Sequence, residues 1–401
     1  MNRTPAPFDP NEDLAPDGTP LAARLPDAAD WLPTLEPGDG EAAALVARLA
    51  ALCDRRGVPA FAPPGKENRI AAALRRLAEP IDWPEGAAAP RLLAALPPNR
   101  ARGLSFPPWE RDAAPGFLSD PAAVGLLRSG WNRTADAVAL AWPDGGPSLE
   151  LRARGRRLFS GTWGLSVAID GDPLDLTDGW ACVCHHADDD GGFLELQWSG
   201  ECAAGPVRVE RQAFLSRDGG FAALSDAVRL TGPEATDAVV EHAMTLPVAA
   251  GLSAGVAPDT REARLFGGRK NWQRGRVFPL ALPQYPGGPE PGSIEAADAA
   301  LTVRHRARGG LVAPVAIDWN RWREDDPADW RTLTVTENRR RLGPAHAGAH
   351  RLRIGRKHHL FLYRRTDDSP APRAALGHHH SWETLIARFS RKGEVSPLLR
   401  V

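Results

Sequence analysis

Short apolar segments separated by turn residues dominate the chain between residues 124 and 226. The segments at 124–131, 149–160 and 207–215 are each about as long as a β-strand or a tight hairpin. Turn sequences such as the Asp-Gly-Gly at 144–146 lie between them. Strand-length apolar runs joined by Gly- and Asp-rich turns are typical of antiparallel hairpins. This stretch therefore predicts an antiparallel β-sandwich.

The same pattern continues to the C-terminus. The predicted strands are 124–131, 136–142, 147–154, 156–160, 163–169, 180–186, 193–198, 206–217, 219–230, 238–247, 262–266, 275–280, 293–296, 299–306, 311–317, 331–336, 348–355, 358–364 and 384–389. Helical periodicity is missing between them, which argues against a doubly wound α/β fold. No fixed-period repeat is visible, so a propeller is not favoured. We expect a mainly β protein, with one large antiparallel two-layer sandwich or super-sandwich over residues 122–401.

The first 121 residues have a different character. Residues 1–40 are rich in Pro, Asp and Gly and are expected to form an extended or disordered arm. Residues 41–97 form a small helical segment, and residues 98–121 read as a Pro-rich linker. The predicted helices, from apolar spacing and stop signals, are 41–56, 67–78 and 89–96.

Charge and composition narrow the class of protein. The 401 residues carry a formal net charge of −1, which gives no overall attraction to nucleic acid or to a membrane, and we expect neither as a partner. The four cysteines are too few for a disulfide framework in a chain of this length. The first residues lack the apolar core of a secretory signal, and no apolar run is long enough to span a bilayer. A cytoplasmic protein of bacterial type is expected, with its oligomeric state open.

Two strands and one hairpin resemble a known family. The Leu-Arg-Ser-Gly-Trp at 127–131, the segment 149–160, and the hairpin segments 209–215 and 223–228 are similar to motifs in the C-terminal β-domain of heparinase II/III-like polysaccharide lyases. The resemblance covers about residues 120–250. It implies a β-sandwich fold and a relation to acidic polysaccharides. The chain also resembles a group of uncharacterised bacterial proteins with a similar ending at 391–399.

The chain differs from that family at the positions where the lyases carry their catalytic residues. The family carries a His-x-His-x-Asp type segment before the second of these strands, but residues 142–148 read Trp-Pro-Asp-Gly-Gly-Pro-Ser. The lyases also place catalytic Tyr and His residues in a large α/α toroid, and only about 120 residues precede the sandwich in this chain. The resemblance therefore supports the fold and not the cleavage reaction.

Cysteine and histidine occur together at 182–186. On a regular strand, Cys182, Cys184 and His186 would point to one face, and thiolate and imidazole are ligands that Zn²⁺ favours. A Cys-x-Cys spacing is unusual for a structural zinc site, and no fourth ligand is evident. Two strand cysteines next to surface histidines are the alternative. We therefore expect no cofactor, and a zinc ion bound by Cys182, Cys184 and His186 is the alternative.

Tryptophan and arginine together suggest carbohydrate binding. The chain has 13 tryptophans and only two tyrosines. Trp272 and the sequence Arg321-Trp322-Arg323 fall in or near predicted loops. Aromatic faces stack on sugar rings, and guanidinium groups bind carboxylates or sulfates. The alternative is that these tryptophans cover the sandwich edges.

Three hypotheses for function remain open. The first is a non-catalytic heparinase II/III-like β-sandwich protein that binds acidic polysaccharide. The second is a polysaccharide lyase or other carbohydrate-active enzyme with relocated residues, which requires a concave cleft lined by Arg and His across one sheet. The third is a protein-interaction module that docks through the N-terminal helices.

Overall fold

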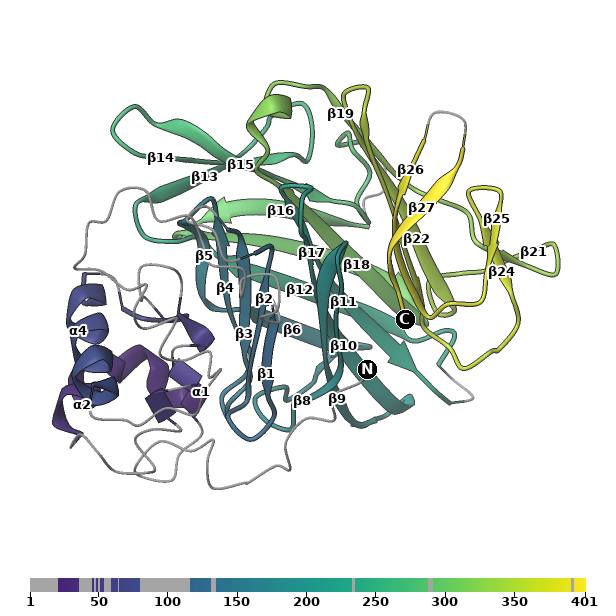
Figure 1. Ribbon diagram of the computed structural model, residues 1–401. Helices are drawn as coiled ribbons and strands as arrows, with labels where there is room; N and C mark the ends of the chain where they lie inside the picture. The colour runs from purple at the N-terminus through teal and green to yellow at the C-terminus, as the bar shows by residue number, and fades with distance from the viewer. Residues whose placement is uncertain are drawn as a thin grey trace.

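The computed structural model describes residues 21–35, 45–46, 48–49, 51–53, 59–63, 65–79, 116–130, 135–232, 235–287, 291–390 and 393–401. It is mainly β, as the sequence predicts, with five antiparallel sheets and a small helical layer (Figure 1). The predicted helix at 89–96 lies outside the described residues, as do residues 1–20 of the arm and most of the linker.

An eight-stranded central sheet organises the molecule. In spatial order its strands are β13 (Leu252–Val256), β14 (Ala263–Gly267), β15 (Trp272–Pro279), β18 (Gly310–Asp318), β11 (Phe221–Leu230), β10 (Gly205–Ser216), β9 (Gly191–Cys202) and β8 (Ala181–Ala187). Every residue of β11 and β18 is buried. Continuous burial requires a cover on both faces, and the unbroken apolar sequence of β18 fits that position.

Two sheets cover one face of the central sheet. The N-terminal sheet contains β1 (Gly116–Ser119), β2 (Val124–Arg128), β3 (Ala137–Ala141), β4 (Ser148–Ala153) and β5 (Arg156–Thr162) in that order. The lateral sheet contains β16 (Gly292–Ala297), β17 (Ala300–Arg308), β12 (Val239–Pro247), β6 (Gly164–Ile169) and β7 (Asp172–Pro173). Both contribute to one continuous apolar core with the central sheet.

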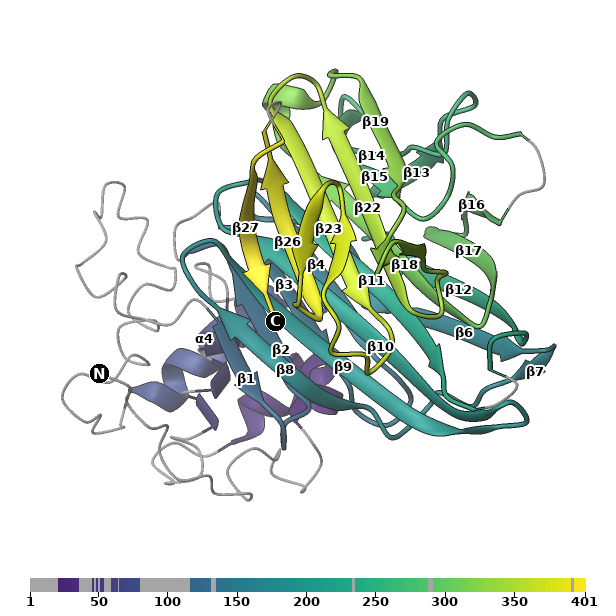
Figure 2. The same cartoon turned by 90° about the vertical axis from the view of Figure 1, so that its right-hand side faces the viewer.

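The C-terminal sheet covers the opposite face of the central sheet. It contains β19 (Ala328–Thr332), β22 (Ala347–Ile354), β23 (His358–Arg365), β26 (Thr384–Phe389) and β27 (Val395–Arg400). A second core, which includes Phe193, Phe214 and Phe278, fills the space between the two sheets. A small sheet lies beyond it, with β21 (Arg340–Arg341), β20 (Thr336–Glu337), β24 (Arg373–Ala375) and β25 (His378–His380). The prediction of a mainly β, antiparallel sandwich is thus confirmed, and of its two forms the two-layer sandwich is too shallow, because sheets lie on both faces of the central sheet (Figure 2).

The helical layer packs on the N-terminal sheet. Its elements are α1 (Leu21–Arg24), η1 (Leu25–Asp27), α2 (Ala28–Trp31), η2 (Leu32–Thr34) and α4 (Glu67–Ala78). The predicted helix at 67–78 is confirmed, and the described residues of the helix predicted at 41–56 are helical through residue 52. Two boundaries are wrong. Residues 21–34 fold into buried helical turns because Leu21, Leu25 and Leu32 join the core, and residues 116–119 of the linker form strand β1.

Charged side chains of the N-terminal sheet hold the helical layer in place. The guanidinium of Arg128 donates to the carbonyl of Cys53 at 2.7 Å, and that of Arg157 donates to the carbonyl of Ala62 at 2.7 Å. The Phe61 amide donates to the Glu150 carboxylate at 3.1 Å. The buried apolar faces of these helices are thus used within the chain. No helix in the described ranges has the length and apolar character needed to cross a membrane.

Candidate functional site

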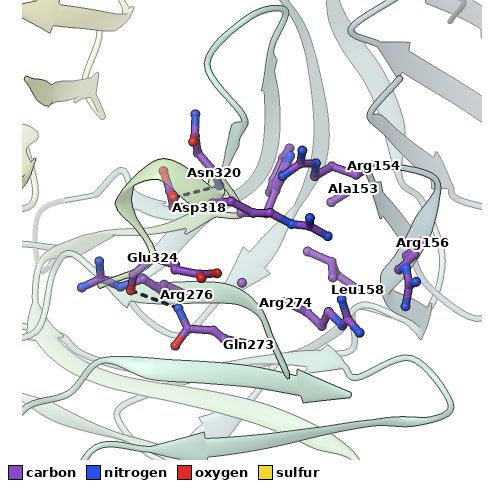
Figure 3. Close-up of a pocket in the computed structure, with 13 residues that line it drawn as sticks. Ala153, Arg154, Arg156, Leu158, Gln273, Arg274, Arg276, Asp318, Asn320 and Glu324 are labelled. Carbon is purple, nitrogen blue, oxygen red and sulfur yellow. Dashed lines mark hydrogen bonds between the residues drawn. The ribbon is translucent and has the colours of Figure 1, made fainter. Parts of the chain in front are cut away.

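Three segments that are distant in sequence form one pocket at an end of the central sheet. They are the β4–β5 hairpin, the first half of β15, and the loop that leads from β18 into the short helix η4 (Arg321–Arg323). The pocket is small, with a cavity volume of about 60 Å³. Its lining includes five arginines, Arg154, Arg156, Arg274, Arg276 and Arg321. We call it the arginine pocket (Figure 3).

A buried carboxylate fixes the hairpin against the β18 loop. Arg154 and Gly155 form the two-residue β4–β5 turn, with φ of +53° and +74°, as in the type I′ turns that suit hairpins. The carboxylate of Asp136 accepts from the Arg154 amide at 2.6 Å and from the Trp319 indole at 2.9 Å. Burial raises the pKa of Asp136 despite these hydrogen bonds, so the group serves as an internal anchor.

Two β-bulges meet at the pocket. One falls in the β4–β5 ladder, where Leu158 is the extra residue. The other falls in the β14–β15 ladder, where Leu265 pairs with Gly275 and Phe266 with Gln273, so that Arg274 is extra. A bulge redirects a side chain away from the regular alternation of the strand. The Arg274 guanidinium also donates to the carbonyl of Gly267 at 2.9 and 3.1 Å, which fixes its position.

Like charges gather on one side of the arginine pocket. Arg154, Arg156 and Arg274 lie on the same side, opposite Asp318 and Glu324 (Figure 3). Burial first, and then the nearby guanidinium groups of Arg156 and Arg321, lower the pKa of Arg274. The side chains of Arg156 and Arg321 make no hydrogen bond or ion pair with any residue that the structure describes. Positive charge is therefore concentrated on this side of the pocket, and neither Arg156 nor Arg321 pairs with a carboxylate of the described residues.

The charges at the base of the pocket are already paired. Arg276 binds both oxygens of the Glu262 carboxylate at 2.8 and 2.9 Å, and it also donates to two backbone carbonyls. Asp318 accepts from Arg323 at 2.8 Å and from the Asn320 amide at 3.1 Å. Burial raises the pKa of Asp318, and Arg323 opposes that effect. The guanidinium groups that can still bind a ligand therefore lie at the rim of the pocket.

The structure places the four predicted sugar-binding residues near one another, with different roles. Arg321 lines the arginine pocket. Trp322 and Trp272 are 94% and 53% exposed, and each directly adjoins a lining residue in the chain. Arg323 instead pairs with the buried Asp318, and its contact with a ligand stays a prediction.

Sequence reasoning missed Arg154, Arg156 and Arg274 as pocket residues. The signal was present, because Arg154 and Arg156 flank the turn glycine at 155, and Arg274 follows Trp272 by two positions.

The predicted metal ligands do not share one face of their strand. A bulge at Val183 shifts the β8–β9 register, so that Cys182 pairs with Leu196 and Cys184 with Glu195. Cys182 consequently packs on the core shared with the N-terminal sheet, and Cys184 packs on the core below the C-terminal sheet.

The remaining predicted ligand, His186, contacts Asp188 at 3.0 Å. Within the described ranges, no group of three or more His, Cys, Asp or Glu side chains is arranged to hold a metal ion. The expectation of a single face for Cys182, Cys184 and His186 is thus wrong, because a bulge breaks the alternation of a strand.

Comparisons with known proteins add little to this picture. No protein-family model and no curated protein matches the sequence. Among solved structures, the chain is similar to 4-alpha-glucanotransferase from Thermococcus litoralis, with 13% identity, a TM-score of 0.29, and 52% of this chain and 40% of that chain covered. It is also similar to an amine oxidase from Aspergillus nidulans, with 7% identity, a TM-score of 0.26, and 56% and 54% covered. The chain thus spans about half the length of these structures or less, and likeness this weak carries no argument about function.

Proposed function

We propose that this protein binds acidic carbohydrate, a sugar bearing carboxylate or sulfate groups, in the arginine pocket. The observation that carries the proposal is the cluster of Arg156, Arg274 and Arg321, whose guanidinium groups lie close enough to lower the pKa of Arg274. Like charges held together in a folded protein repel one another, and an anion placed between them removes that repulsion. Guanidinium groups bind the flat oxygens of carboxylate and sulfate with two parallel hydrogen bonds.

The surroundings of the pocket favour a sugar over a simple inorganic anion. The exposed indoles of Trp272 and Trp322 lie on the two segments that supply Arg274 and Arg321. Exposed aromatic faces of this kind stack on the apolar faces of pyranose rings. The Glu324 carboxyl group faces the pocket, where it can accept hydrogen bonds from sugar hydroxyls (Figure 3).

Binding without cleavage is the form of the proposal that agrees with the sequence. The resemblance to heparinase II/III-like lyases supports an acidic sugar as the ligand, and the departures at 142–148 do not support cleavage. The lining residues of the arginine pocket include no His or Tyr among those that the structure describes. The arginine pocket is therefore not the Arg- and His-lined cleft that the hypothesis of an enzyme with relocated residues requires.

Calorimetric titration with a heparin hexasaccharide at low salt tests this function, with maltohexaose as the uncharged control. We expect binding of the sulfated sugar only. Arg274→Gln and Arg321→Gln should each weaken it by at least about tenfold, because each removes a charge-assisted hydrogen bond of roughly 1.5–3 kcal/mol. Arg340→Gln, which changes an exposed arginine on β21, is the matched control and should bind normally.

Equal losses in all three variants would mean that the sugar senses only net charge, and the pocket would then not be the site. Titration with sodium sulfate alone separates sugar recognition from anion binding. If sulfate at the same concentration binds as tightly as the hexasaccharide, the site is a general anion site. A cytoplasmic location and the absence of nucleic-acid and membrane partners stay predictions from the sequence.

A further inference from the structure

A second, larger cavity lies between the sheets and away from the arginine pocket. It has a volume of about 500 Å³ and is lined by residues of β17, β18 and β22 and by the segments 332–335 and 341–344. In Figure 2, β18 lies between β22 on one side and β17 on the other. Most of the lining is apolar, with Leu311, Val312 and Leu333 among its residues, and its charged members are Arg306 and Arg341. Cavities of a few hundred to about a thousand Å³ are typical small-molecule sites.

Two prolines explain why this space is open. The β15–β18 ladder runs from the pair Arg276–Asp318 to the pair Pro279–Val315 and then stops. Pro314 follows on β18 and has no N–H to continue the ladder, which is why proline sits where strand pairing ends. Its carbonyl accepts a last hydrogen bond, from the Leu280 amide at 2.9 Å. Beyond this point β18 pairs only with β11 among the described strands, and the cavity occupies the open side.

Two histidines bring unsatisfied polar atoms to this apolar space. His305 lines the cavity from β17 and His350 lines it from β22. Both side chains are buried, at 5% and 3% exposure. Neither ring nitrogen of His305 has a hydrogen-bond partner in the described part of the chain, and the Nε2 atom of His350 also lacks one. Buried polar atoms without a partner are rare and each one requires an explanation.

The histidines are neutral rings. Burial first, and then the imidazoles of His242 and His350, lower the pKa of His305 well below its usual value. Burial also lowers the pKa of His350 to about 4, despite a hydrogen bond with the carbonyl of Leu280. A neutral imidazole offers one donor and one acceptor. The complementary group on a ligand is therefore an uncharged one that can both donate and accept, and a hydroxyl fits this description.

The residues behind His305 hold this arrangement in place. The His242 ring lies 5.7 Å from that of His305, centroid to centroid, and its Nε2 atom contacts the Asp226 carboxylate at 3.0 Å. Asp226 is in turn bound by Arg211 at 2.9 Å. Asp226 is therefore already occupied by two partners, which leaves the nitrogens of His305 for a group inside the cavity.

We propose that this cavity is a second binding site, specific for a small aromatic or alicyclic molecule that carries a hydroxyl group. The apolar walls receive the ring, and the hydroxyl exchanges hydrogen bonds with His305. This site is independent of the arginine pocket, and a sugar-binding result at that pocket neither supports nor contradicts it.

Fluorescence titration with 2-naphthol tests the proposal, with naphthalene as the probe that lacks the hydroxyl. We expect 2-naphthol to bind about tenfold more tightly, which is the effect of satisfying a buried polar group. His305→Phe should remove this difference while naphthalene still binds. His379→Phe changes an exposed histidine on β25 and should leave both affinities as they are in the wild type.

A second variant keeps the test valid if His305→Phe does not fold. Leu333→Trp fills the cavity from a partly buried position and should abolish binding of both probes, while circular dichroism shows the native spectrum. Equal affinities for 2-naphthol and naphthalene in the wild type would overturn the proposal. Undiminished 2-naphthol binding in Leu333→Trp would also overturn it, because the probe would then be bound elsewhere.

Discussion

Arginine occurs in two contrasting settings in this molecule. In the arginine pocket, Arg156 and Arg321 are exposed and face a third arginine instead of a carboxylate. Between the sheets, Arg211 and Arg364 are buried and surrounded by carboxylates and carbonyls. The side chain is the same, but the partners that the fold supplies are different. The contrast separates arginines that hold the structure together from arginines available to a ligand.

Arg364 is a clear example of the structural kind. Its guanidinium group lies between the central and C-terminal sheets, 2.8 Å from Glu195, 2.5 Å from Glu210 and 3.1 Å from Glu383. The Thr384 hydroxyl accepts another of its hydrogen bonds at 2.6 Å. Burial lowers the pKa of Arg364, but the three carboxylates outweigh burial and raise it above its usual value. The charge is thus stable only while its partners remain.

Arg211 is enclosed even more completely. It binds Asp226 at 2.9 and 3.2 Å and lies over the Trp163 ring at 3.8 Å from the ring centre. Burial raises the pKa of the Asp226 carboxyl, but Arg211 and His242 outweigh burial and leave it below its usual value. A buried charge is tolerated only with such partners. An arginine without them, as in the pocket, must therefore remain at the surface.

The largest expected effect is the loss of stability on removing a buried arginine. Arg364→Met leaves Glu195 and Glu210 buried without a counter-charge, and we expect the free energy of unfolding to fall by about 3–5 kcal/mol. Urea denaturation followed by circular dichroism measures this change. The triple variant with Glu195→Gln and Glu210→Gln should recover part of the loss, because the uncompensated charges are removed. A loss below about 1 kcal/mol for Arg364→Met would show that the two settings do not differ in this way.

Features formed by residues close together in sequence could be predicted, and features formed by residues far apart in sequence could not. Strand positions follow from local periodicity and turn residues, so β10, β11 and β18 were predicted within a few residues. Short edge strands such as β13 and β25 were missed, because three to five residues carry little periodic signal. The stacking of sheets on both faces of the central one is a tertiary property that no local pattern encodes.

The candidate site was predictable in part for the same reason. The sequence Arg321-Trp322-Arg323 identified one of the three segments of the pocket. The partners of Arg321 come from a hairpin more than 160 positions away, and a bulge directs Arg274 towards them. A bulge is also the reason why Cys182 and Cys184 do not share the strand face that was predicted for them. His358 and His359 are buried in β23, within the predicted strand 358–364, whereas His380 is buried in β25, which was not predicted.

A fall in pH should lower the stability of the fold through its buried histidines, and it should leave ligand binding at the arginine pocket unchanged. The folded-state pKa of His350 is lowered by burial from 6.5 to about 4. Between these values the unfolded chain takes up more protons than the folded one, so stability is full above the unfolded pKa and is lost as pH falls towards the folded pKa. From pH about 7 to about 5, we expect His350 to account for a loss of about 2 kcal/mol.

Denaturation at several pH values measures this loss, and His350→Asn should have a flatter pH dependence than the wild type. His380, with a pKa also lowered by burial to about 4, contributes in the same window and remains in both proteins. Affinity for a sulfated sugar should stay constant over the same range while the protein is folded, because arginine and sulfate keep their charges. If the affinity for the sulfated sugar fell together with the stability, the distinction between the buried interior and the arginine pocket would be contradicted.

The smallest effect, and the sharpest test of the contrast, concerns the stability of the pocket variants. Arg156→Gln and Arg321→Gln each remove one member of a like-charge cluster and no hydrogen bond or ion pair with a described residue. The free energy of unfolding should therefore stay unchanged or rise by up to about 0.5 kcal/mol, as for other surface charges. Urea denaturation at low salt detects this, since salt screens the repulsion. Destabilisation by more than about 1 kcal/mol would mean that these arginines have structural partners like those of Arg364. The proposal that the pocket binds a ligand would then be contradicted.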